Sequence, residues 1–158
     1  MKNVLKRVAQ AAGIITILAV VPAVGAGPVQ VPAGGIEEGF QLSPELVFPA
    51  FDAALGRKLF ATKGCVVCHE ANGIGGTDGP SMSYGKYDTP VNAMEVASDL
   101  WEKAPIMIPM QEDELGAQIE LSPEELAAII AFLGSPSEQA KFSKDQIPAD
   151  ILKDMEDM

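Results

Sequence analysis

Apolar side chains that recur every three or four residues predict three helices in the middle of this 158-residue chain. The helices cover about residues 50–63, 93–104 and 123–133. A glycine follows the first and the third stretch, and a proline follows the second, so each pattern ends at a residue that stops helices. No stretch alternates apolar and polar residues over the length of a strand. The pattern therefore predicts an all-α domain with long loops between its helices.

The first 26 residues have the layout of an export signal. Three basic residues within the first seven precede an apolar run over 8–24, and small residues surround a cleavage point after Ala26. The apolar run is short for a membrane span. We therefore expect a cleaved secretory signal at residues 1–26 and a periplasmic protein. An uncleaved N-terminal segment that tethers the protein to the membrane is the alternative.

Two segments of different composition flank the predicted helices. Residues 27–49 are rich in Gly, Pro and Val, which is typical of an extended linker. Residues 135–158 are polar and acidic, and a last short helix is predicted to begin near Pro148. We therefore expect one helical domain over residues 50–134, with a linker before it and an acidic C-terminal extension after it.

The chain has two cysteines and one histidine, and all three lie within one five-residue run. Cys65, Cys68 and His69 form the Cys-x-x-Cys-His signature of covalent haem attachment. In such a site the two thiols form thioether bonds to the vinyl groups of the haem, and the imidazole binds the iron. The run therefore predicts one covalently bound haem c per chain, with two cysteine attachment points and one histidine ligand.

Three other roles of this run fit the sequence less well. A thioredoxin-like redox pair belongs at a strand-to-helix junction, and no parallel-sheet pattern surrounds these cysteines. A structural disulfide across so short a loop gains little loop-closure entropy. A structural zinc site needs four ligands, and the chain has no further cysteine or histidine to complete one. The residue types therefore favour haem.

The second iron ligand cannot be another histidine of this chain, because the single histidine is already used. Methionine is the common alternative and raises the reduction potential. Met82 and Met94 are candidates by residue type, but gap-filling in the core suits them better. Met107 and Met110 lie in a proline-rich segment, 105–110, which we expect to be a loop that folds over the opposite haem face. An open sixth position remains as the alternative.

The charge of the chain limits its partners. The formal net charge is −11, and the three basic residues of the signal segment leave 8 basic and 22 acidic residues, or −14, in the rest. This balance excludes nucleic acid as a partner. It favours a redox partner protein with a basic docking surface, although acidity that only keeps an exported protein in solution explains it equally well.

From residue 50 to residue 133 the chain resembles the class I c-type cytochromes. The resemblance implies an all-α class I cytochrome c fold, in which the first and last helices of the domain cross around one covalently bound haem. Small and aromatic residues lie at this crossing in the family, and Gly56, Phe60 and Phe132 match those positions.

A subgroup of small bacterial mono-haem cytochromes is more similar still. It shares the Gly-Gly-x-x-Gly-Pro loop at 75–80, where the family pattern implies that the Pro80 carbonyl accepts the proton of the non-ligating nitrogen of His69. It also shares a Trp-x-x-x-Pro-x-Met run that ends at Met107. This register favours Met107 over Met110 as the second iron ligand. Glu and Lys replace the usual Asn and His within the run, at positions 102 and 103.

The resemblance implies a mono-haem cytochrome that carries single electrons between periplasmic or membrane redox partners and is not itself an enzyme. Two alternatives stay open at this point. One is a dedicated haem subunit that accepts electrons in a periplasmic dehydrogenase complex, which the segments flanking the domain would suit. The other is a haem sensor or a peroxidase-like enzyme with an open sixth site.

Overall fold

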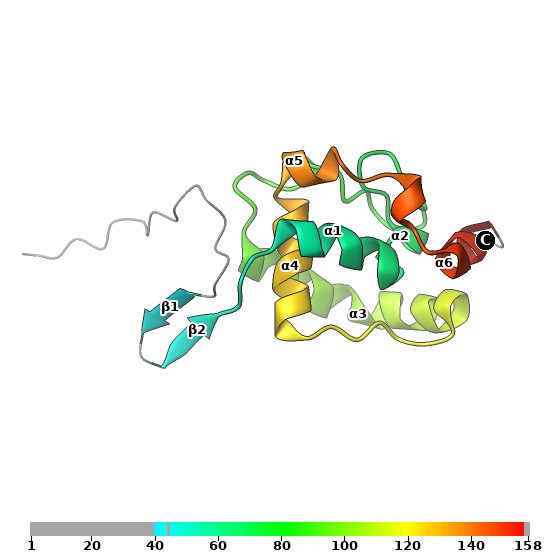
Figure 1. Ribbon diagram of the computed structural model, residues 1–158. Coiled ribbons are helices and arrows are strands. Elements are labelled where there is room, and N and C mark those ends of the chain that lie inside the picture. The colour runs from blue at the N-terminus through cyan, green and yellow to red at the C-terminus, as the bar shows by residue number, and fades with distance from the viewer. Residues whose placement is uncertain (1–39, 44, 157–158) are drawn as a thin grey trace, which may run out of the picture. The chain divides into compact units, whose positions relative to one another are not determined.

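The computed structural model describes residues 40–43 and 45–156, and this part of the chain is built mainly of helices (Figure 1). The predicted signal segment and most of the predicted linker lie outside the described residues. None of the helices in the described part is long and apolar enough to cross a membrane. In chain order they are α1 (Ala53–Thr62), α2 (Cys65–Cys68), α3 (Ala93–Leu115), α4 (Pro123–Leu133), α5 (Pro136–Gln139) and α6 (Ala149–Glu156), with a 3-10 turn, η1 (Lys144–Gln146), before α6.

A small antiparallel sheet lies within the segment predicted to be an extended linker. Strand β1 (Phe40–Ser43) pairs with β2 (Leu46–Phe48), with an irregular register between Gln41 and Ser43. The sequence predicted only an extended linker here and gave no sign of this hairpin. Strands of 4 and 3 residues are too short for an alternating pattern to stand out from the surrounding composition.

Helix α1 begins at a side-chain cap and crosses α4 in close contact (Figure 1). The carboxylate of Asp52 accepts hydrogen bonds from the backbone N–H groups of Ala54 (3.0 Å) and Leu55 (2.9 Å), which have no partner within the helix. At Gly56 the two helices approach so closely that a Cβ atom would lie 1.9 Å from the carbonyl oxygen of Ala128. The predicted crossing at Gly56 is thus confirmed.

Three phenylalanines form the centre of the core next to this crossing. The rings of Phe60 in α1 and Phe132 in α4 are 5.5 Å apart, and the ring of Phe142 lies 5.5 Å from the first and 5.9 Å from the second. Each of the three residues is at most 2% exposed. Tilted and edge-to-face pairs at such distances contribute about 0.5–1.5 kcal/mol beyond the area they bury. Phe142 comes from the C-terminal segment, so that segment completes the core.

Polar contacts also hold the C-terminal segment in place. Gln139 is 3% exposed and donates a hydrogen bond to the carbonyl oxygen of Met82 (3.0 Å), while its own amide oxygen accepts one from the backbone N–H of Tyr84 (2.6 Å). Arg57 of α1 donates to the carboxylate of Glu138 at 3.0 Å. A segment that its composition marks as a polar extension is therefore packed against the helices.

Helix α6 follows directly after Pro148, as the sequence predicted. Three of its apolar side chains pack against the main core: Ile151, Leu152 and Met155.

Helix α3 is longer than its sequence suggested. It was expected to end at Pro105, with a loop over residues 105–110, but it continues through Pro105 and Pro109 to Leu115 and ends at Gly116 in a left-handed conformation. Each internal proline removes one backbone hydrogen bond. Both proline side chains are exposed, so water can satisfy the carbonyls they leave free. The half-buried face of the helix meanwhile continues past both prolines without interruption.

The close approach of α1 and α4 predicts that Gly56→Ala destabilises the protein. The added methyl group would meet backbone atoms of Ala128, which cannot move without separating the helices, so the free energy of unfolding should fall by about 1–3 kcal/mol or more. Gly134→Ala is the matched control, because its Cβ would meet nothing closer than 3.5 Å. Guanidinium unfolding of both variants measures the difference, and equal midpoints would contradict the tight crossing.

Candidate haem-attachment site

The Cys-x-x-Cys-His run forms a single helical turn directly behind α1. Gly64 separates the two helices with a φ of 86°, in the left-handed region that glycine adopts most easily. Helix α2 then spans Cys65 to Cys68, and the backbone N–H of His69 donates to the carbonyl oxygen of Cys65 at 3.0 Å. The turn brings both thiols and the imidazole into one short structural unit, which the spacing of the motif requires.

The loop that follows the motif folds back and bonds to it. The backbone N–H of Gly76 donates to the carbonyl oxygen of Val66 at 2.9 Å, and that of Gly79 donates to Cys68 at 2.8 Å. Gly76 has no room for a side chain, because a Cβ there would lie 1.8 Å from the carbonyl oxygen of Val67. The glycines of this loop therefore allow it to lie directly on the backbone of the motif.

The loop fixes the ring of His69 from two sides. Nδ1 of His69 lies 2.8 Å from the carbonyl oxygen of Pro80. Since a carbonyl only accepts hydrogen bonds, Nδ1 carries the proton, and the lone pair on Nε2 is left for another ligand. Gly79 lies against the same ring, where a Cβ would be 2.3 Å from Cε1. The hydrogen bond to Pro80 is the one that the family resemblance implied. The contact with Gly79 was not predicted. The glycine directly before Pro80 could have indicated it, because a residue without a side chain leaves room for a neighbouring ring.

The two cysteines form no disulfide in the structure, and their environment keeps the thiols protonated. Burial raises the pKa of the Cys65 thiol to about 11. Burial also raises the pKa of Cys68, and the carboxylates of Asp78 and Glu114 raise it further. A nucleophilic redox cysteine needs a lowered pKa, because the thiolate is the reactive form. The thiols therefore lack the activation of a redox pair.

The methionines expected in a loop lie instead on α3, and both are half-buried. Met107 is seven residues, almost two full turns, from Leu100 on one side and Glu114 on the other, so these three share a face. Leu100 packs against the main core, and the Glu114 carboxylate is close enough to Cys68 to raise its pKa. The face of α3 that carries Met107 thus runs past the motif.

Met110 lies nearer the edge of this face. It is three residues from Met107, which turns it by about 60° around the helix axis toward the solvent side.

The two remaining candidates are placed for other roles. The sulfur of Met82 accepts a hydrogen bond from the hydroxyl of Tyr87 at 2.8 Å, and Met82 also packs against the main core. This agrees with the core role that the sequence favoured for it. Met94 is 62% exposed, so the corresponding core role is wrong for this residue. Met94 lies on the outer side of α3 near its start, so its side chain faces away from the core.

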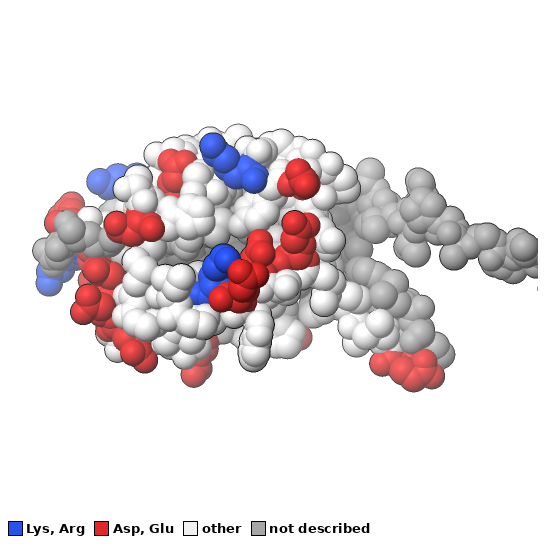
Figure 2. All heavy atoms as spheres, turned by 180° about the vertical axis from the view of Figure 1, so that it is seen from behind, with Lys and Arg blue, Asp and Glu red and all other residues white. Residues whose placement is uncertain are grey.

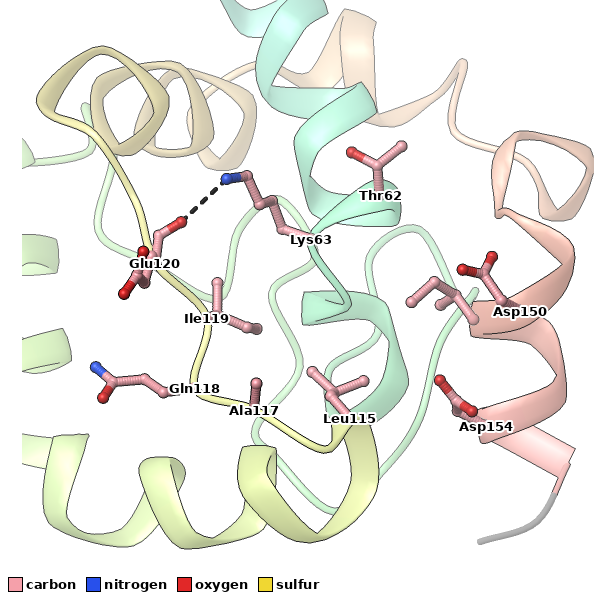
Figure 3. Close-up of a pocket in the computed structure, with 10 residues that line it drawn as sticks. Thr62, Lys63, Leu115, Ala117, Gln118, Ile119, Glu120, Asp150 and Asp154 are labelled. Atoms are coloured by element: carbon pink, nitrogen blue, oxygen red, sulfur yellow. Dashed lines mark hydrogen bonds between the residues drawn. The ribbon is translucent and has the colours of Figure 1, made fainter.

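An open hollow lies beside the motif, between the end of α1, the segment after α3, and α6 (Figure 3). Lys63 borders it and donates to the carbonyl oxygen of Glu120 at 3.0 Å. Asp150 and Asp154 border it from α6. The contact between Gly64 and Leu115, where a Cβ would lie 2.8 Å from the leucine side chain, links this hollow to the motif.

The packing of Gly79 against His69 predicts that Gly79→Ala disturbs the haem site more than the fold. The methyl group would overlap the imidazole, so the ring must turn and lose its hydrogen bond to Pro80. We expect a lower reduction potential or a loss of low-spin haem in the absorption spectrum, with the helical circular dichroism retained. Gly134→Ala again serves as the control, and a Gly79→Ala protein with an unchanged spectrum and potential would contradict this packing.

The family model for cytochrome c matches residues 53–137, which span the motif, the Gly-Pro loop, α3 and the crossing of α1 with α4. Comparisons with curated proteins and with solved structures gave no match. The match covers more than half of the chain and agrees with the helical fold described above. The chain therefore belongs to the cytochrome c family, whose members bind haem c covalently and use it for electron transfer.

Proposed function

We propose that Cys65 and Cys68 form the two thioether bonds to haem c and that Nε2 of His69 binds its iron. The observation that carries this assignment is the 2.8 Å hydrogen bond from Nδ1 of His69 to the Pro80 carbonyl. It holds the imidazole in one orientation and one tautomer, which metal-binding histidines typically require from their surroundings. The protonated, unpaired thiols in the same helical turn supply the attachment points.

Met107 is the proposed second iron ligand, with Met110 as the alternative. Met107 stands on the face of α3 that packs toward the core and passes Cys68, whereas Met110 stands nearer the solvent side. A thioether ligand opposite a histidine raises the reduction potential of haem iron. A ligand held on a continuous helix, with its neighbours packed in the core, also moves little when the charge of the iron changes.

The bound haem supplies a change of one electron between its Fe(III) and Fe(II) forms. The protein residues contribute position and shielding: the Gly-rich loop clamps the ring of His69, and the face of α3 that carries Met107 would shield the bound haem. We infer that the protein carries electrons between redox partners and is not itself an enzyme, because electron transfer is the general role of cytochrome c domains.

The C-terminal segment bears on the choice between a free carrier and a subunit of a dehydrogenase complex. If residues 135–156 were an unpacked extension, contact with another subunit would be a natural role for them. Instead Phe142 and Ile147 are at most 4% exposed within the core of this chain, and Gln139 ties the segment to the loop after the motif. The segment has a role in the stability of the domain itself, which favours the free carrier.

We propose that this carrier is periplasmic, which the predicted export signal at residues 1–26 supports. Members of the family are typically exported, which supports the same location.

The ligand assignment predicts the spectra of two matched variants. Met107→Ala should lose the thioether-to-iron charge-transfer band and bind carbon monoxide in the reduced state, because its sixth position is open. Met110→Ala should keep the band and exclude carbon monoxide. Optical spectra of both purified haem proteins measure this. The reverse pattern would assign Met110 instead, and a wild-type protein without the band would point to a sensor or peroxidase-like site.

The export signal makes a separate prediction about the mature chain. The intact mass of the protein from the periplasmic fraction should equal residues 27–158 plus one haem, because cleavage is expected after Ala26. Full-length mass in the membrane fraction would establish the uncleaved anchor instead. Reduction with dithiothreitol should leave the haem attached in either case, since thioether bonds resist thiols.

A further inference from the structure

The outer side of α3 exposes an unusual amount of apolar surface. Trp101 is 84% exposed, Ile106 66% and Met94 62%, and these are the three most exposed of the large apolar residues on this helix. Trp101 is also the only tryptophan of the chain. Exposed tryptophan on a regular helix is uncommon, and tryptophan is among the residues that contribute most to protein–protein binding.

Met94 and Trp101 belong to one connected stripe, whereas Ile106 lies about 140° around the helix axis from Trp101. Met94, Trp101 and the half-buried Ile108 are each seven residues apart, so they lie along the same side of α3. The exposed ring of Pro105 lies between Trp101 and Ile108 on that side. The long helix gives this stripe its full length, because a helix that ended at Pro105 would have left Ile108 in a loop.

Carboxylates border the stripe on its solvent side. Helix α3 contains six acidic residues and one basic residue, Lys103, which is paired with Glu102 at 2.6 Å. Figure 2 shows acidic side chains in several groups on one face of the molecule, with basic ones more thinly spread. The exposed carboxylates of α3 belong to Glu95, Asp99, Glu102, Glu112 and Asp113. Glu112 and Glu102 lie about 20° and 60° around the axis from Pro105 and border the stripe, whereas Asp99 lies nearly opposite Trp101.

We propose that this α3 surface, formed by Met94, Trp101 and Pro105 with its carboxylate border, docks a redox partner protein with an apolar centre and a basic rim. The proposal rests on the proposed function, in which Met107 on the inner side of the same helix binds the iron. A partner seated on α3 would then be separated from the iron ligand by little more than one helix, about 10 Å across. The carboxylates would steer a basic partner toward the surface.

Two other occupants fit the charges poorly. A second copy of this chain would bring two carboxylate borders together, which like-charge repulsion disfavours. The chain's own segment after the signal, residues 27–39, contains Glu37 and Glu38 and no basic residue. A basic partner is the occupant that complements both the apolar stripe and its border.

The test measures electron transfer from the reduced haem protein to a small oxidant that shares the proposed partner's chemistry. Tris(1,10-phenanthroline)cobalt(III) is a trication with flat aromatic ligands, and it takes one electron to become cobalt(II) as the haem iron becomes Fe(III). Stopped-flow absorbance gives the second-order rate constant at low and high salt. Ferricyanide, a trianion, serves as the oxidant of opposite charge.

Matched variants separate α3 from the rest of the surface. Glu102→Gln with Glu112→Gln removes two carboxylates from the border, and Asp145→Asn with Glu156→Gln removes two exposed carboxylates elsewhere. We expect the first pair to slow the cobalt reaction about tenfold at low salt, with the difference shrinking at high salt, and the second pair to change it much less. Neither pair should slow the ferricyanide reaction.

Removal of the aromatic anchor gives a second comparison. Trp101→Ala should slow the cobalt reaction at both salt concentrations, whereas Tyr84→Ala, at an aromatic residue 45% exposed outside α3, should not. Equal effects of the matched variants would overturn the docking surface. So would a dimer of the wild-type protein in light scattering that Trp101→Ala turns into a monomer. The haem spectrum of each sample reports the ligand assignment separately, so a normal spectrum with equal rates rejects the α3 surface alone.

Discussion

The arrangement of the site depends on how the loop over residues 70–82 holds His69. The imidazole is bound on one edge by the Pro80 carbonyl and covered by Gly79, and the same loop bonds back to the backbone of the motif at Val66 and Cys68. This arrangement leaves Nε2 as the nitrogen with a free lone pair. Without it, a histidine on a short helical turn would have two interchangeable nitrogens and a rotating ring. The covalent bonds of two cysteines would then position the haem but not its iron ligand.

The rest of the fold supports this loop. The crossing of α1 and α4 at Gly56 sets the position from which the motif begins, since Gly64 and α2 follow α1 directly. The C-terminal segment then stabilises both the helix crossing and the loop that follows the motif. Phe142 completes the ring cluster at the crossing, and Gln139 bonds to the backbone at Met82 and Tyr84, where the loop leaves the site. The segment beyond the matched family region is thus part of what holds the motif and its loop together.

Local features of the site could be predicted from the sequence, and features that depend on tertiary contacts could not. The Cys-x-x-Cys-His spacing and the glycine at the helix crossing leave direct signatures, because each requires a particular residue type at a particular position. The continuation of α3 through Pro105 and Pro109 was missed, since the local rule that proline ends a helix ignores the packed inner face that keeps this one intact. Phe142 and Ile147 were missed because they are isolated apolar residues in a polar segment, and only the folded core shows where they go. The helix carrying Met107, and with it the apolar stripe of Trp101, therefore emerged only from the structure.

The hydrogen-bonded state of the His69 ring is the central claim, and nitrogen-15 NMR of the reduced haem protein tests it most directly. We expect a proton on Nδ1 that exchanges slowly with solvent, because the Pro80 carbonyl accepts it, and an Nε2 that carries no proton. A proton on Nε2, or an Nδ1 proton that exchanges as fast as an exposed imidazole, would contradict the claim that this loop orients His69 toward the iron.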